Sequence, residues 1–245
     1  MDLCASLERG ERGARGQRDH RAIETYGQGG NCGFDHTFYY DNAFLVMDKN
    51  KLFVLESCRR SWVVKSYPRA SISNRLSIHA DGERYGGGVC DFAKTHSDPL
   101  YSHFSGSKQR KAASACALPT ASTEADIMRA LRSHDERVKN PFAEGSVSSY
   151  CMHYGGMVGS HSTASMVIRL DDGAPTVFLT GTSTPAVSLY KPYRFGNPTR
   201  EPWSSRTTNP PRYWREAERF RRALIGKIVP AELYAERDAR WKRAG

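Results

Sequence analysis

The sequence predicts an α+β protein. Short apolar runs rich in β-branched and aromatic residues form a strand meander over residues 43–65 and a strand hairpin over residues 163–180. Helical patterns occupy residues 123–137, 213–227 and 231–242. Strands and helices thus fall in separate stretches of the chain, which favours the α+β class.

The meander is the stretch around which the first half is organised. Ala43–Asp48 is apolar, the polar Lys49–Lys51 is short enough for a hairpin turn, and the apolar pattern resumes at Leu52–Glu56 and Trp62–Lys65. Because these runs are almost wholly apolar, we expect both faces of the sheet to be covered. The polar cluster Ser73–Ser77 follows, at the end of a predicted fourth strand, where a sheet presents side chains to a site.

A second sheet segment lies in the other half of the chain. Thr163–Leu170 predicts a strand, Asp171–Gly173 a turn with glycine available for positive φ, and Thr176–Thr180 the return strand. We expect this hairpin to pair into a sandwich with the meander.

Helix signals flank this hairpin. Thr123 followed by Asp126 resembles a capping box, which predicts a helix running to about Arg137 with His134 on its surface. Beyond the hairpin, Lys191–Pro211 is rich in Pro, Ser and Arg and predicts an irregular loop. The C-terminal helices follow that loop, over Tyr213–Lys227 and Ala231–Lys242.

Composition excludes several classes of function. The 245 residues carry a net charge of +10, yet no run of five basic residues and no nucleic-acid motif is present, so we expect no nucleic-acid partner. No apolar run reaches transmembrane length, and the charged N-terminal stretch lacks an apolar core, so neither a membrane span nor a signal peptide is expected. These features predict a cytoplasmic protein.

Cysteine usage predicts reduced thiols and no metal site or cofactor. Wide, irregular spacings separate the six cysteines, which are Cys4, Cys32, Cys58, Cys90, Cys116 and Cys151. Cys151 and His153 come closest to a ligand pair, but two residues at i and i+2 on one strand rarely supply a complete site.

Short segments spread over most of the chain carry a family resemblance. In order they are Tyr26–Cys32, Asn42–Val46, Val54–Glu56 with Trp62, Ile72–Ile78, Asp98–Tyr101, Leu131–His134, Cys151–His153, Ala164–Val167, Thr180–Ser183 and Lys191–Pro192. Their order and spacing resemble the secernin and peptidase C69 family of dipeptidases. That resemblance implies an N-terminal-nucleophile (Ntn) hydrolase with an αββα sandwich, whose nucleophile is a cysteine exposed as the first residue after processing.

The resemblance covers only the C-terminal part of such an enzyme. It implies an incomplete sandwich domain over residues 1–190 and a loop and helical tail, packed on it, over residues 191–245. The family's nucleophile-bearing strand has no counterpart among these segments, and Cys4 does not replace it because the matching family segment is a helix. We therefore expect hydrolysis of amide bonds in dipeptides or acyl-amino compounds only when a separate N-terminal half completes the site.

Two residues resemble site residues of the wider group of cysteine Ntn hydrolases. Asn74 resembles an oxyanion donor, since a neutral amide N–H at a strand end can meet a developing negative charge; alternatively it caps a turn. Arg110, in Ser107-Lys108-Gln109-Arg110, resembles the arginine near the nucleophile, or is one of many surface arginines. Cys151 with His153 offers a nucleophile pair, with packing beside the core as the alternative.

Glu56 and Trp62 are predicted to be core-edge residues rather than catalytic ones. The alternative function for the whole chain is a non-enzymatic secernin-like remnant or interaction module. Such a module binds a partner chain or a second copy of itself through a sheet edge left open by the missing strands.

Overall fold

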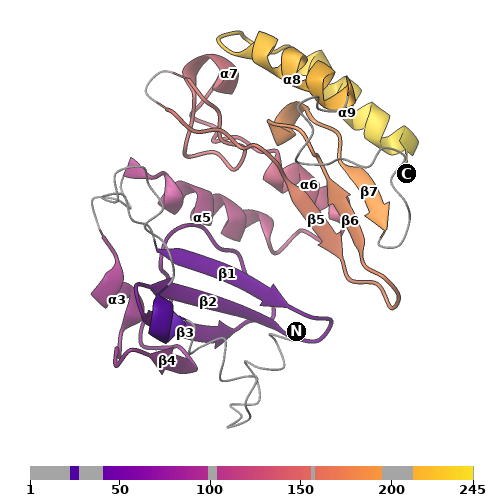
Figure 1. Ribbon diagram of the computed structural model, residues 1–245. Helices are drawn as coiled ribbons and strands as arrows, with labels where there is room; N and C mark the ends of the chain where they lie inside the picture. The colour runs from indigo at the N-terminus through magenta and orange to yellow at the C-terminus, as the bar shows by residue number, and fades with distance from the viewer. Residues whose placement is uncertain (1–22, 28–40, 99–103, 156–157, 195–211, 245) are drawn as a thin grey trace. The chain divides into compact units, whose positions relative to one another are not determined.

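The computed structural model describes residues 23–27, 41–98, 104–155, 158–194 and 212–244 (Figure 1). The chain divides into two compact units, residues 1–119 and residues 120–245. Each unit holds one small antiparallel sheet together with helices, so the predicted α+β class is confirmed. The domain boundary expected at residue 190 stays a prediction.

The first unit is built on a four-stranded antiparallel sheet of order β1-β2-β3-β4. Its strands are β1 (Asn42–Met47), β2 (Leu52–Cys58), β3 (Ser61–Ser66) and β4 (Arg84–Gly86). The turn between the first two strands forms where predicted, because the Asp48 carboxylate accepts the N–H groups of Asn50 at 2.7 Å and Lys51 at 2.9 Å. A short side chain that accepts local backbone N–H groups is the ordinary chemistry of such turns.

Coverage of this sheet differs from strand to strand. β2 is almost wholly buried, as predicted, and β3 is buried over residues 62–64; the two strands form the core with Ile78 and Phe92. β1 is the end strand, and its Phe44, Leu45 and Met47 are 45%, 45% and 54% exposed. The prediction that both faces are covered is therefore wrong for β1.

The predicted fourth strand over residues 72–78 is absent, and β4 takes its place beside β3. The backbone N–H groups of Ser77 and Ile78 donate to the buried Glu56 carboxylate instead of to a neighbouring strand. This segment is thus an irregular loop tied to β2 by a side chain.

Among the described residues of the first unit, residues 23–26 are helical and two further helices follow the strands. α3 (Phe92–His96) begins at Asp91, whose carboxylate accepts the N–H of Lys94, and it buries Phe92 and Ala93. α5 (Ser107–Ala117) begins after Gly106, which has φ +65°. Glycine reaches this left-handed conformation without the steric cost that other residues meet.

The second unit holds a three-stranded antiparallel sheet of order β5-β6-β7, with strands β5 (Met166–Arg169), β6 (Thr176–Leu179) and β7 (Lys191–Arg194). The β5–β6 hairpin is confirmed, with β5 shorter than predicted. The segment of β7 was predicted to belong to a loop because residues 191–211 are rich in Pro, Ser and Arg, but Pro192 is tolerated on an end strand, where β7 lies. Residues 195–211 of the predicted loop lie outside the described residues.

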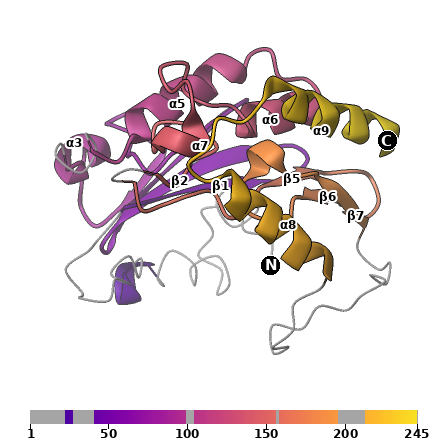
Figure 2. The same ribbon diagram turned by 90° about the horizontal axis from the view of Figure 1, so that it is seen from above.

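The helices of the second unit are α6 (Glu124–Leu131), α7 (Pro141–Glu144), the 3-10 helix η1 (Pro185–Val187), α8 (Arg212–Leu224) and α9 (Ala231–Ala244). α6 packs on β5 (Figure 2), and contacts also join α9 to η1. The capping box of Thr123 and Asp126 is confirmed, as are both C-terminal helices. α6 ends at Leu131, however, six residues before the predicted end.

No helix among the described residues is both long enough and apolar enough to cross a membrane.

Candidate functional site

The structure brings together the two site residues predicted from the sequence. Asn74 lies in the loop that carries residues 72–78, and Arg110 lies in the first turn of α5. The Arg110 guanidinium donates a hydrogen bond from Nη2 to the Asn74 side-chain oxygen. Because that oxygen accepts from Arg110, the amide –NH2 of Asn74 is the end of the side chain that can donate to another group.

Hydrogen bonds at the start of α5 hold Arg110 in place. Its Nη1 donates to the carbonyl of Ser105 at 2.7 Å. Ser107 is fully buried and accepts two hydrogen bonds. The Ser73 hydroxyl donates to its carbonyl at 3.0 Å, and the Ser105 hydroxyl donates to its hydroxyl at 2.9 Å. The bonds of Ser73 to Ser107 and of Arg110 to Asn74 therefore both join the loop to the helix, so the two side chains keep their relative positions.

Glu56 is the anchor beneath this loop. It was predicted to be a core-edge residue, but its side chain is fully buried. Its carboxylate accepts the N–H of Ser77 at 2.9 Å, the hydroxyl of Ser77 at 2.7 Å and the N–H of Ile78 at 3.0 Å. Charge-assisted hydrogen bonds of this kind are stronger than neutral ones, so Glu56 fixes the path of the chain just beyond Asn74.

Lys111 adds a second cation beside Arg110. Its Nζ donates to the carbonyl of Ser71, on the same loop. Burial lowers the pKa of Lys111, and the negative charge of Glu56 partly offsets this effect. The loop thus carries a neutral amide donor and accepts hydrogen bonds from a guanidinium at Asn74 and an ammonium group at Ser71. Amide donors and cations of this kind suit a carbonyl oxygen or a carboxylate.

The buried thiols are not poised as nucleophiles. Burial, with a hydrogen bond from Cys58 to Asp41 as the second cause, raises the pKa of Cys58 to about 12, and burial raises that of Cys151 to about 12. Both thiols are therefore protonated at neutral pH, whereas the thiolate is the reactive form. Cys90 and Cys116 are exposed. Cys4 lies outside the described residues.

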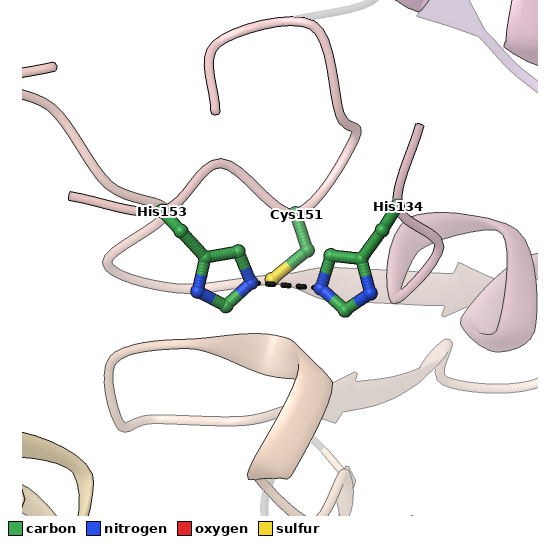
Figure 3. A group of neighbouring side chains, drawn as sticks. All are labelled: His134, Cys151 and His153. Atoms are coloured by element: carbon green, nitrogen blue, oxygen red, sulfur yellow. Dashed lines mark hydrogen bonds between the residues drawn. The ribbon is translucent and has the colours of Figure 1, made fainter. Parts of the chain in front are cut away.

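A second cluster, which we call the His-Cys-His cluster, consists of His134, Cys151 and His153 in the second unit. Figure 3 shows the three side chains pointing toward one another. Their nearest donor atoms all lie within 4.8 Å of one another, and the two Nε2 atoms are 2.7 Å apart. His134 therefore belongs to a cluster and is not the helix-surface residue that was predicted.

Backbone hydrogen bonds bring the two segments of this cluster side by side. The N–H of Cys151 donates to the carbonyl of Ser133 at 3.2 Å, and the N–H of Asp135 donates to the Ser149 hydroxyl at 2.9 Å. His153 exchanges backbone hydrogen bonds with Ser146 at 2.9 and 3.0 Å. The early end of α6 makes this possible, because the chain leaves the helix before His134.

Both imidazoles are neutral at pH 7. Burial, with the charge of Arg237 as the second cause, lowers the pKa of His134 to about 4. Burial, with the charge of His134 as the second cause, lowers the pKa of His153 to about 3. One Nε2 must donate its proton and the other must accept it, since they lie at hydrogen-bond distance. His153 therefore pairs with His134 rather than with Cys151, which argues against a Cys-His nucleophile pair and leaves the alternative of packing beside the core.

Sequence reasoning missed this cluster because the helical pattern extended through residue 137. The available signal was that Leu131–His134 and Cys151–His153 both carry the family resemblance. Segments that share a resemblance but lie apart in the sequence can meet in space, as these do.

In comparisons with known proteins, no family model matches the chain and no solved structure matches its fold.

Proposed function

We propose that the first unit supplies the oxyanion-binding part of a cysteine Ntn-hydrolase site that cleaves amide bonds in dipeptides or acyl-amino compounds. The hydrogen bond between Arg110 and Asn74 is the observation that carries the proposal. It joins two residues that were singled out separately by their resemblance to site residues of the wider cysteine Ntn-hydrolase group, 36 positions apart in the sequence. The αββα sandwich of that family is part of the same proposal.

The proposed roles follow from the chemistry of acyl transfer. Attack on an amide carbonyl places negative charge on its oxygen, and the Asn74 –NH2 donates to that oxygen. The Arg110 guanidinium orients the Asn74 amide by occupying its oxygen and adds positive charge beside the site. The thiolate comes from an N-terminal cysteine on a further segment that resembles the family's N-terminal half.

Reconstitution tests this proposal. The purified chain and the same chain fused to the N-terminal half of a C69 dipeptidase are compared on a panel of dipeptides. We expect turnover from the fusion and none from the chain alone, because attack needs the nucleophile. A folded fusion with an intact N-terminal cysteine and no turnover of any dipeptide would contradict the proposal. So would thiol-dependent turnover by the chain alone.

The exposed end strand favours a second candidate function, a non-enzymatic interaction module. β1 presents Phe44, Leu45 and Met47 at the end of the sheet, each at least 45% exposed. An exposed apolar end strand is a template on which a strand of another chain can add by main-chain hydrogen bonds. In this second candidate function the partner is a second copy of the chain, and a substitution in β1 tests whether the chain dimerises through that strand.

A further inference from the structure

The His-Cys-His cluster gathers three metal-binding atoms in one buried place. Cys151 is fully buried, His153 is 3% exposed and His134 is partly buried. Two imidazole nitrogens and one sulfur converge from two segments that backbone hydrogen bonds hold side by side. Neither Asn74 nor Arg110 belongs to the cluster, so the inference drawn from it is independent of the proposed function.

The chemistry of the donors selects a class of ion. Imidazole nitrogen and thiolate sulfur suit zinc and copper, whereas calcium and magnesium prefer oxygen ligands. Zinc sites with three protein ligands and an open fourth position use combinations of His and Cys of this kind.

We propose that His134 Nε2, Cys151 Sγ and His153 Nε2 bind a divalent transition-metal ion of the zinc type as its three protein ligands. A tetrahedral site with zinc–nitrogen bonds of about 2.0–2.1 Å separates its two nitrogens by about 3.3 Å. The two Nε2 atoms are 2.7 Å apart in the metal-free arrangement, so the rings need to separate by only about half an ångström.

The proton balance of binding can be written from this geometry. The thiol of Cys151 loses its proton to solvent when sulfur bonds to the metal. One Nε2 carries the proton of the hydrogen bond between the histidines, and that proton moves to Nδ1 of the same ring, which frees the lone pair. The neutral imidazoles bind as they are, so each ion bound releases about one proton.

The surroundings of Cys151 stabilise its thiolate once a metal holds it. The backbone N–H of Ala186 donates to the sulfur, and the positive charges of Arg132 and Arg237 lie close enough to favour the thiolate. Arg132 is itself fixed, with Nε donating to the carbonyl of Pro185 at 3.1 Å and Nη2 to that of Ser188 at 2.6 Å. Burial opposes the charged sulfur, so the ion supplies the charge that completes the site.

A small cavity gives access to this region. It has a volume of about 140 Å³, and His134, Val138, Phe142 and Tyr234 are among the residues that line it. The ring of Phe142 also packs on His153, with ring centroids 4.3 Å apart. The cavity therefore adjoins the cluster at His134.

Cobalt substitution tests the site directly, with no activity measurement involved. The purified chain is stripped with chelator and titrated with Zn²⁺, and separately with Co²⁺, in the presence of a weak competing chelator. We expect one zinc ion per chain and a thiolate-to-cobalt charge-transfer band. Cys151→Ala is expected to lose the band, whereas the control Cys116→Ala, at an exposed cysteine, keeps it.

His134→Gln provides a second variant, because His134 is less buried than Cys151 and its replacement disturbs the core less. In this variant we expect zinc affinity to fall at least about 10-fold, as for loss of one ligand, with the circular dichroism spectrum unchanged. A folded wild-type chain that takes up no stoichiometric zinc or cobalt would overturn the proposal. Zinc affinity unchanged in folded His134→Gln, or a charge-transfer band that persists in Cys151→Ala, would also overturn it.

Discussion

At the scale of single residues, buried polar side chains decide how the loop of Asn74 is held. Glu56 lies on β2, yet its three accepted hydrogen bonds all come from Ser77 and Ile78. The sequence placed this glutamate in an apolar strand, but it could not show that a loop some twenty residues later supplies its partners. The hydrogen bond between Asn74 and Arg110 could likewise not be predicted from the sequence, although each residue was singled out separately.

Removing the Glu56 carboxylate should therefore destabilise the first unit. Glu56→Ala leaves the N–H groups of Ser77 and Ile78 without their acceptor, and a buried donor left unsatisfied costs about 1–3 kcal/mol. We expect a loss of about 3 kcal/mol in the free energy of unfolding, measured with urea.

Glu83→Ala is the matched control for this measurement. Glu83 also accepts a backbone N–H and a hydroxyl, both from Ser66, but it is exposed. Water can replace it, so we expect a loss below about 1 kcal/mol. If Glu56→Ala and Glu83→Ala lowered the free energy of unfolding equally, the burial of Glu56 would add nothing to the strength of its hydrogen bonds.

The histidines of the His-Cys-His cluster should make stability depend on pH. Their pKa values, about 4 and about 3 in the folded chain, lie below the ordinary histidine value of 6.5, so the unfolded chain binds protons first as the pH falls. Their contribution is complete above pH 6.5 and declines below it. Between pH 7 and pH 5 we expect a loss of about 2 kcal/mol for each histidine, and so on the order of 4 kcal/mol for the pair, in the free energy of unfolding.

The measurement is urea unfolding at both pH values, with chelator present, for the wild type and a His134→Gln, His153→Gln variant. His96 and His161, whose pKa values are also lowered by burial, are common to both proteins and cancel in the comparison. The variant should show a clearly smaller loss. The same pH dependence in both proteins would mean that the pair does not titrate as described.

At the scale of elements, local patterns predicted the regular segments well and their ends poorly. The β1–β2–β3 meander, the β5–β6 hairpin and helices α8 and α9 follow from apolar periodicity, which is a property of the local sequence. The end of α6 and the loop over residues 72–78 depend on hydrogen bonds to distant residues. Such contacts override local propensity, which is why His134 was placed on a helix that ends before it.

The exposed strand β1 leads to a prediction about assembly. If β1 adds to a second copy, the purified chain sediments as a dimer at micromolar concentration, and Leu45→Lys shifts it to monomer. A charge on an end strand blocks edge-to-edge pairing. The control is Ile127→Lys, at a residue 43% exposed on α6, which should leave sedimentation unchanged. A wild-type chain that stays monomeric would remove this candidate function.

At the scale of the whole molecule, the sequence predicted the α+β class but not the division at residues 119 and 120. Division into compact units depends on which contacts form between distant segments, and local periodicity carries little information about those. Resemblance to cysteine Ntn hydrolases pointed to Asn74 and Arg110 in one unit, and the secernin and C69 segments included Cys151 and His153 in the other. Only the structure shows that the first pair is hydrogen-bonded and that the second recruits His134.

The central claim is that Asn74 donates to an oxyanion in the completed enzyme, and the kcat of the Asn74→Ala variant of the reconstituted fusion tests it most directly. We predict that kcat falls by about 10²–10³ with a smaller change in KM, because the interaction strengthens mainly in the transition state. Asn50→Ala, at an exposed turn asparagine, is the control and should keep wild-type kcat. A folded Asn74→Ala fusion with unchanged kcat would contradict the claim and leave Asn74 as a residue that only holds its loop.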